Sequence, residues 1–134
     1  MTTVVDASVV VASLLDIGPA GQWAERIMGR GVLHAPELVM AETAQAIRHL
    51  ERARRISRPE AEAAFNNLME LDLRLYSFAP LAARVWELRH AATSYDAWYV
   101  AVAEALELPL ATLDLRLVRA AGLSCRFLTF EARS

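Results

Sequence analysis

The amino-acid sequence predicts an α/β fold built on a parallel β-sheet. A chain of 134 residues with a hydrophobic content of 55% has enough apolar surface for one core, so we expect a single domain spanning residues 1–134. Short β-branched or apolar runs alternate along the chain with segments of helical periodicity. Residues that favour helix caps occur at several boundaries between a predicted strand and a predicted helix. This alternation is typical of a parallel sheet sandwiched by helices.

The N-terminal part is predicted to begin with a strand that ends at an acidic residue. Thr3–Val5 is short and rich in β-branched residues, and Asp6 follows it directly. Gly29 or Gly31 is suited to end the second helix. The predicted elements are a strand over Thr3–Val5, a helix over Ser8–Leu15, a helix over Ala20–Met28 and a strand over Val32–His34.

The middle of the chain is predicted to hold a long amphipathic helix, a second helix and a further strand–helix pair. Pro36 suits the first turn of a helix, and Ser57 with Glu60 has the spacing of a capping box. The predicted elements are a helix from Pro36 to about Arg55, a helix from Ser57 to about Leu71, a strand over Leu73–Phe78 and a helix over Pro80–Ala91.

The C-terminal part repeats the alternation. Thr93 and Ser94 can cap a helix, and Gly122 can end the following one. The predicted elements are a helix over Tyr95–Glu107, a strand over Pro109–Thr112, a helix over Leu115–Ala121 and a strand over Cys125–Leu128.

The composition excludes several classes of protein. Cys125 is the only cysteine, so the chain can form neither an internal disulfide nor a thiolate zinc cluster of its own, and we expect a cytoplasmic protein. The longest apolar runs fall far short of the roughly 20 residues that a membrane helix needs, so we expect no membrane association. A net charge of −2 argues against strong overall basicity but leaves room for a local basic patch.

Two aspartates lie at the ends of predicted strands. Asp6 comes after the first strand, and Asp114 comes just after the strand that ends at Thr112. Ligand sites in open parallel sheets lie outside the carboxyl ends of the strands, so both are candidates for chemistry. Each can instead be an ordinary helix cap, which is the commoner role of a lone aspartate in this position.

Two further acids are predicted to reach the same edge of the sheet. Glu42 lies one turn from Val39 and Ala46, on the inward face of its helix, where an unpaired carboxylate is costly. A metal, a guanidinium or an exposed position at the helix edge can each account for it. Asp96 stands in the first turn of its helix, where the helix dipole favours an anion whatever its function.

Four converging carboxylates repel one another unless a cation lies between them. Oxygen ligands without histidine or cysteine favour Mg²⁺ or Mn²⁺ over zinc. Such a site polarises a phosphoryl oxygen and orients a hydroxide for in-line attack, which is the chemistry of phosphodiester hydrolysis.

Four segments carry a resemblance to a known family. They are Val4-Val5-Asp6-Ala7-Ser8, Pro36-Glu37-Leu38 leading to Glu42, Ser94-Tyr95-Asp96-Ala97-Trp98-Tyr99, and Thr112-Leu113-Asp114-Leu115-Arg116-Leu117. Over nearly its whole length the chain resembles a PIN domain of the VapC toxin type. The resemblance implies a three-layer sandwich with a short central parallel sheet flanked by helices. It also implies that the catalytic, metal-binding acids are Asp6, Glu42, Asp96 and Asp114, with Ser8 and Thr112 as their hydroxyl neighbours.

The resemblance implies an activity and partners as well. The expected activity is that of an endoribonuclease dependent on Mg²⁺, with Mn²⁺ as a substitute. The expected partners are an RNA substrate, a second copy of the chain in a homodimer, and a cognate antitoxin whose C-terminal segment covers the site. Leu113 and Leu115 depart from the more polar residues that many relatives carry beside this aspartate, which puts extra substrate contacts there in doubt.

Two other functions compete with the nuclease. A PIN-like module can bind RNA or protein without turnover, although the presence of all four acids argues against it. A phosphoacceptor receiver domain also has an aspartate at a strand end, but it needs a late lysine, and the chain contains none.

Two groups of side chains have open roles. An arginine cluster near the end of the long helix can contact RNA phosphates or an acidic partner, or can simply be a solvated helix end; its members are Arg48, Arg52, Arg54, Arg55 and Arg58. Arg116 can reach a phosphate or pair with a site acid. Trp98 and Tyr99 can stack on bases, but aromatic residues at helical spacing are more often core.

Overall fold

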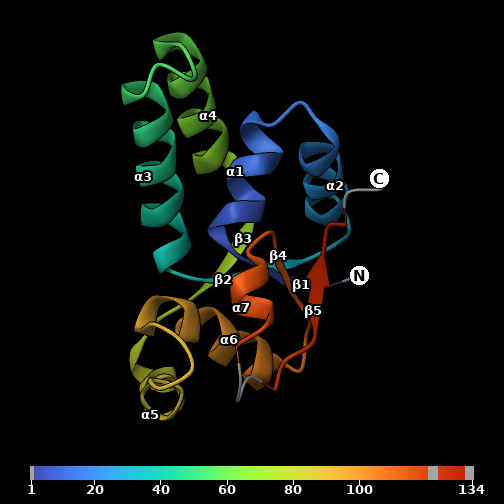
Figure 1. The fold of residues 1–134 in the computed structure, drawn as a ribbon, viewed down its shortest axis with the longest axis vertical. Coiled ribbons are helices and arrows are strands. Elements are labelled where there is room, and N and C mark those ends of the chain that lie inside the picture. The colour runs from blue at the N-terminus through green and yellow to red at the C-terminus, as the bar shows by residue number, and fades with distance from the viewer. Residues whose placement is uncertain (1, 121–123, 132–134) are drawn as a thin grey trace.

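The computed structural model describes residues 2–120 and 124–131 and contains a five-stranded sheet between two groups of helices (Figure 1). The strands are β1 (Thr3–Val5), β2 (Leu33–Pro36), β3 (Leu73–Tyr76), β4 (Leu110–Thr112) and β5 (Phe127–Thr129). The helices are α1 (Ala7–Leu15), α2 (Pro19–Met28), α3 (Leu38–Arg52), α4 (Arg58–Glu70), α5 (Ala82–Glu87), α6 (Ser94–Leu106) and α7 (Leu115–Val118). A single 3₁₀ turn, η1 (Ala79–Leu81), precedes α5.

All strand pairs in the sheet are parallel, and the strand order is β3-β2-β1-β4-β5. β1 lies at the centre, where Val4 is opposite His34 of β2 on one side and Leu110 of β4 on the other. The three residues of β1 are buried, as expected for a strand covered on both faces.

Helices cover both faces of the sheet, which confirms the predicted α/β class and the three-layer sandwich. In the view of Figure 1, α1, α2, α3 and α4 lie above the sheet, and α5 and α6 lie below it. α6 contacts β1, β2 and β4, and its residues from Tyr99 to Ala103 are all buried. The core therefore runs through the sheet between α1 and α6.

The start of the long helix differs from the prediction. Pro36 is the last residue of β2 instead of the first residue of a helix, and α3 begins at Leu38. Proline fits there because β1 pairs with β2 only at Leu33 and His34, so no partner on that side needs an N–H from Pro36. Glu37 then joins the sheet edge by donating its N–H to the carbonyl of Tyr76, at 2.9 Å.

The region predicted as one helix over Pro80–Ala91 is broken. It contains η1 and then α5, which ends at Glu87 because the chain must turn to reach the start of α6. The Leu88 N–H contacts the carbonyls of both Arg84 and Val85, as is common where a helix tightens and ends.

The last predicted elements are shifted. α7 ends at Val118 instead of Ala121, and the predicted stop at Gly122 lies outside the described residues. β5 begins at Phe127 instead of Cys125, because its pairing with β4 extends from Phe127 to Thr129. Within the described part of the chain, no helix is both long and apolar enough to cross a bilayer.

Candidate active site

The carboxyl ends of two adjacent strands, β1 and β4, bring the first two acids to one edge of the sheet. Asp6 follows β1 directly and caps α1, while Asp114 follows β4 after one intervening residue and caps α7. β1 and β4 are parallel neighbours, so their ends lie together. The capping role that the sequence left open for both aspartates is therefore present, and it coexists with their position at the sheet edge.

Asp6 is a buried carboxylate held by three donors. Its Oδ1 accepts hydrogen bonds from the Ser8 hydroxyl at 2.5 Å and from the Val9 N–H at 3.2 Å, and its Oδ2 accepts one from the Thr112 hydroxyl. Only 7% of the residue is exposed. Two carboxylate oxygens offer about four lone-pair sites, so these three bonds leave room on Oδ2 for a further cation or donor.

Burial and hydrogen bonding act in opposite directions on Asp6. Burial raises the pKa of the carboxyl above its usual range, and the hydrogen bonds from Ser8, Thr112 and Val9 partly offset this rise. The charged form of Asp6 is therefore costly in the folded chain without a nearby cation.

Ser8 and Thr112 connect Asp6 to the loop after β4. The Ser8 hydroxyl accepts a hydrogen bond from the Leu113 N–H at 3.0 Å, and the Thr112 hydroxyl accepts one from the Asp114 N–H at 2.9 Å. Because both hydroxyls also donate to Asp6, they fix its two oxygens relative to the backbone that carries Asp114.

Asp96 and Asp114 lie close enough to repel each other. The pKa of Asp96 is raised mainly by burial and then by the negative charge of Asp114, while Thr93 and Arg116 partly offset the rise. The Asp96 N–H donates to the Thr93 hydroxyl at 3.1 Å, which is the cap predicted for this helix. Asp114 pairs with the exposed Arg116 at 3.4 Å, so Arg116 contacts a candidate site acid in the structure.

Glu42 has a hydroxyl as its hydrogen-bond partner. The Tyr99 hydroxyl, on α6, donates to Oε1 of Glu42, on α3, at 2.5 Å. The pKa of Tyr99 is raised above its ordinary value by burial first, then by Glu42 and by the charge of Asp6. Tyr99 therefore lies within electrostatic reach of two of the candidate acids.

The structure therefore brings the four candidate acids together as two pairs. The charge of Asp114 acts on Asp96, and Tyr99 donates a hydrogen bond to Glu42 while the charge of Asp6 acts on its phenol. Within residues 2–120 and 124–131, no three Asp, Glu, His or Cys side chains are already gathered closely enough to hold a metal ion. The donor set itself consists of hard oxygens, and mutual repulsion with raised pKa values is the electrostatic setting that a divalent cation relieves.

The two aromatic residues that follow Asp96, Trp98 and Tyr99, pack mainly in the core. Tyr99 is 2% exposed and is not accessible for stacking on a base. Trp98 is partly buried and packs edge-on against Phe78, with ring centroids 5.3 Å apart. The sequence does not predict the contact of Tyr99 with Glu42. The three-residue spacing from Asp96 indicates only that Tyr99 and Asp96 share a face of their helix.

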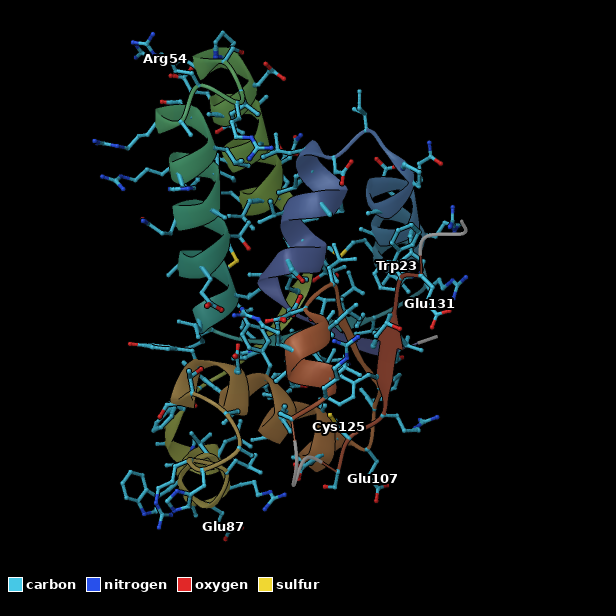
Figure 2. All side chains as sticks on the ribbon, viewed as in Figure 1. Trp23, Arg54, Glu87, Glu107, Cys125 and Glu131 are labelled. Carbon is cyan, nitrogen blue, oxygen red and sulfur yellow. The ribbon has the colours of Figure 1, made fainter. Side chains whose placement is uncertain are left out.

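The arginine cluster is exposed at the far end of the α3–α4 hairpin. Figure 2 shows Arg54 at the tip of this hairpin, and all five members of the cluster are exposed. Arg58 pairs with Glu62 at 3.1 Å. The helix-end interpretation accounts for this position, and the proposed contacts with phosphates stay a prediction.

Comparison with known proteins assigns the chain to a family. The model of the PIN domain family matches residues 3–123. The chain is 43% identical over 128 residues to Ribonuclease VapC1 of Mycobacterium tuberculosis, covering 91% of this chain and 92% of the relative. It is 40% identical over 114 residues to Ribonuclease VapC9 of the same organism, covering 85% and 87%.

A solved structure agrees at the level of the fold. The crystal structure of M. tuberculosis VapC20, described as a sarcin–ricin loop cleaving toxin, superposes with a TM-score of 0.66 at 23% identity and covers 91% of this chain and 96% of that one. The family match covers most of the chain and both curated relatives align over most of their length, so the chain belongs to the PIN domain family, among its VapC members.

Proposed function

We propose that this chain is a single PIN-like domain over residues 1–134 that acts as an endoribonuclease, the toxin of a toxin–antitoxin pair. The observation that carries the proposal is the buried Asp6 at the carboxyl end of β1, held by Ser8 and Thr112 at the sheet edge that also carries Asp114. The names of VapC1 and VapC9, both ribonucleases, support an RNA substrate.

We propose Asp6, Glu42, Asp96 and Asp114 as the catalytic acids that hold Mg²⁺, with Mn²⁺ as a substitute. Their carboxylate oxygens suit a hard divalent ion. The raised pKa values of Asp6 and Asp96 support the assignment, because a cation between these groups offsets both burial and repulsion. When bound, the ion supplies Lewis-acid polarisation of a phosphoryl oxygen and a hydroxide for in-line attack.

The protein's own residues position these acids. Ser8 and Thr112 fix the two oxygens of Asp6, so the carboxylate loses little rotational freedom when it binds a cation. Thr93 caps α6 and keeps Asp96 in the first turn of that helix. Arg116 is 93% exposed, so it can turn from Asp114 towards a phosphate when RNA approaches.

We infer that the partners are a cognate antitoxin and a second copy of the chain, in the cytoplasm, as expected for VapC toxins. A largely apolar groove of about 650 Å³ supports the proposal that an antitoxin segment binds the chain. It begins at Ala7 and Ser8, beside Asp6, and extends between α1 and α3 to Arg55 and Ile56. A segment lying in this groove would contact Ser8, which donates a hydrogen bond to Asp6. No observation favours the alternative of a PIN-like module without turnover.

Cleavage of a pooled RNA substrate tests the proposal. The purified chain is incubated with Mg²⁺, with Mn²⁺ and with EDTA, and Asp6→Asn serves as the control. Asn preserves size and capping ability but removes the charge, so we expect metal-dependent cuts that fall at least 100-fold in the variant. Equal cleavage by both proteins, or cleavage in EDTA, would contradict the proposed site.

A further inference from the structure

Tyr99 places a hydroxyl inside the candidate site from the core of the molecule. Its side chain is among the largest that are fully buried, and a buried phenol requires a hydrogen-bond partner. The partner is Oε1 of Glu42, 57 residues away in the chain, at 2.5 Å. The contact connects α6, below the sheet, to α3, above it (Figure 1).

The hydroxyl of Tyr99 interacts with two of the four candidate acids, Glu42 and Asp6, and a third, Asp96, lies on the same helix. Tyr99 follows Asp96 by three residues on α6, so both side chains extend from the same face of the helix. It donates to Glu42, and the negative charge of Asp6 acts on it. The backbone of Ala7, at the start of α1, also faces the phenol.

The hydrogen bond from Tyr99 fixes the side-chain orientation of Glu42, which α3 alone does not fix. A glutamate side chain has several rotatable bonds and loses considerable rotamer freedom when it is fixed. The Tyr99 ring is held by surrounding core residues, so its hydroxyl fixes one oxygen of Glu42 and leaves the other available. The phenol O–H is the donor in this bond, because a carboxylate oxygen can only accept.

We propose that Tyr99 is a positioning residue that holds the Glu42 carboxylate in the orientation that binds the divalent cation. The inference rests on the proposed function, since it assigns Tyr99 a role towards the ion that the four acids bind. A purely structural role is the alternative, in which the hydroxyl only satisfies a buried polar group.

The substitution Tyr99→Phe separates these roles because it removes the hydroxyl and keeps the ring. Tyr76→Phe is the matched control: the Tyr76 hydroxyl bonds Nδ1 of His34 at 2.6 Å, between β3 and β2. For each protein we would measure Mn²⁺ affinity by electron paramagnetic resonance, together with kcat and KM for RNA. We expect Tyr99→Phe to weaken Mn²⁺ binding and to lower kcat by roughly 10–100-fold with KM nearly unchanged, and Tyr76→Phe to match the wild type.

A double-mutant cycle tests whether Tyr99 acts through Glu42. On a Glu42→Ala background, Tyr99→Phe is expected to cause no further loss of Mn²⁺ affinity, because the group that it positions is gone. A full additional loss on that background would overturn the inference. Mn²⁺ affinity of Tyr99→Phe equal to that of the wild type would also overturn it, while leaving the ribonuclease proposal intact.

A second measurement needs no substitution at Tyr99. The chain has three tyrosines, Tyr76, Tyr95 and Tyr99, so incorporation of 3-fluorotyrosine gives three ¹⁹F signals. Spectra of Tyr76→Phe and Tyr95→Phe assign the Tyr99 signal by elimination. We expect Mg²⁺ to shift this signal saturably; a Tyr99 signal that does not move in Mg²⁺-saturated protein would contradict the inference. A wild type that binds neither Mg²⁺ nor Mn²⁺ would overturn the proposed metal site and this inference together.

Discussion

Asp6 combines the deepest burial among the four candidate acids with the largest number of hydrogen bonds from the protein. Its burial raises the pKa of the carboxyl even though three donors favour the charged form. The ionised residue therefore opposes folding when no cation is present. A residue that costs stability and is still held in one orientation is typical of a functional site.

The stability of the metal-free chain should depend on pH through Asp6. Below the unfolded pKa of about 3.8, the carboxyl is protonated in both states and contributes no penalty. As pH rises, the unfolded chain ionises first because the folded pKa is higher, so the free energy of unfolding falls until the folded pKa is passed. Asp6→Asn lacks this loss, so its advantage over the wild type should grow from acidic to neutral pH.

Urea unfolding in EDTA at several pH values between 3 and 7 measures this difference. Asp96→Asn should behave in the same direction, because burial and Asp114 also raise the pKa of Asp96. A wild type that gains stability relative to Asp6→Asn as pH rises would mean that the hydrogen bonds outweigh burial at Asp6.

Thr112 is expected to matter through its hydroxyl alone. It is fully buried, donates to Asp6 and accepts from the Asp114 N–H. Thr112→Val keeps the shape but leaves a buried carboxylate oxygen without its donor, so we expect a loss of about 1–3 kcal/mol in unfolding free energy. Ribonuclease activity should fall roughly 10–100-fold.

Thr112→Ser is the control for this prediction, since it retains the hydroxyl and removes only a methyl group. Chemical denaturation and initial cleavage rates would be compared for the three proteins. If Thr112→Ser loses as much activity as Thr112→Val, the methyl packing and not the hydroxyl would be responsible.

At the scale of elements, the predicted helix caps are confirmed, whereas two predictions that depended on neighbouring strands were wrong. The Ser57–Glu60 capping box and the Thr93 cap are present where the sequence predicts them. The prediction that Pro36 begins a helix was wrong, because the end of β2 depends on how far β1 extends beside it. The start of β5 was likewise set by its pairing with β4, which the local sequence does not contain.

The residue after α3 has an unfavourable backbone conformation that a substitution can relieve. Arg54 follows the helix with a φ of 58°, a conformation that costs an ordinary residue about 1–2 kcal/mol relative to glycine. The N–H of Arg55 bonds the carbonyl of Leu50 at 2.9 Å, which is the bond pattern of a glycine-type helix end. Arg54→Gly should therefore raise the free energy of unfolding by about 1 kcal/mol.

The same substitution inside the helix should have the opposite sign. Arg48→Gly, at an exposed position within α3, should lower the free energy of unfolding by about 1 kcal/mol, since glycine is a poor helix former. Glu107 ends α6 with a φ of 55°, so Glu107→Gly should also raise the free energy of unfolding. Figure 2 labels Glu107 and Arg54. Thermal or urea unfolding measures all three, and destabilisation by Arg54→Gly would contradict the assignment of strain.

For the molecule as a whole, the sequence was sufficient for the fold class and for nominating the acids, but not for their surroundings. Asp6 and Asp114 could be nominated because strand ends are visible in the pattern, and parallel strands end at one edge. Tyr99 could not be distinguished from a core aromatic, because its contact with Glu42 joins helices from opposite sides of the sheet. Such a contact depends on tertiary packing and leaves no local signal.

Divalent cations should stabilise the whole molecule. A ligand that binds only the folded state adds about 2.7 kcal/mol at 100 times its Kd, which corresponds to a rise of roughly 10 °C in Tm for a chain of this size. We expect Mg²⁺ or Mn²⁺ to raise the Tm of the wild type by this order and to leave Asp6→Asn almost unchanged. NaCl at matched ionic strength is the control, and an equal rise in NaCl would indicate general screening.

The central claim is that the four acids form one metal site. Its most direct test is a Mn²⁺ titration of the wild type and of four single variants, in which electron paramagnetic resonance measures the bound ion. The variants are Asp6→Asn, Glu42→Gln, Asp96→Asn and Asp114→Asn. If these four acids form one metal site, the wild type binds Mn²⁺ saturably and each variant weakens that binding at least tenfold. Saturable binding that is unchanged in all four variants would place the ion elsewhere and contradict the account of the active site.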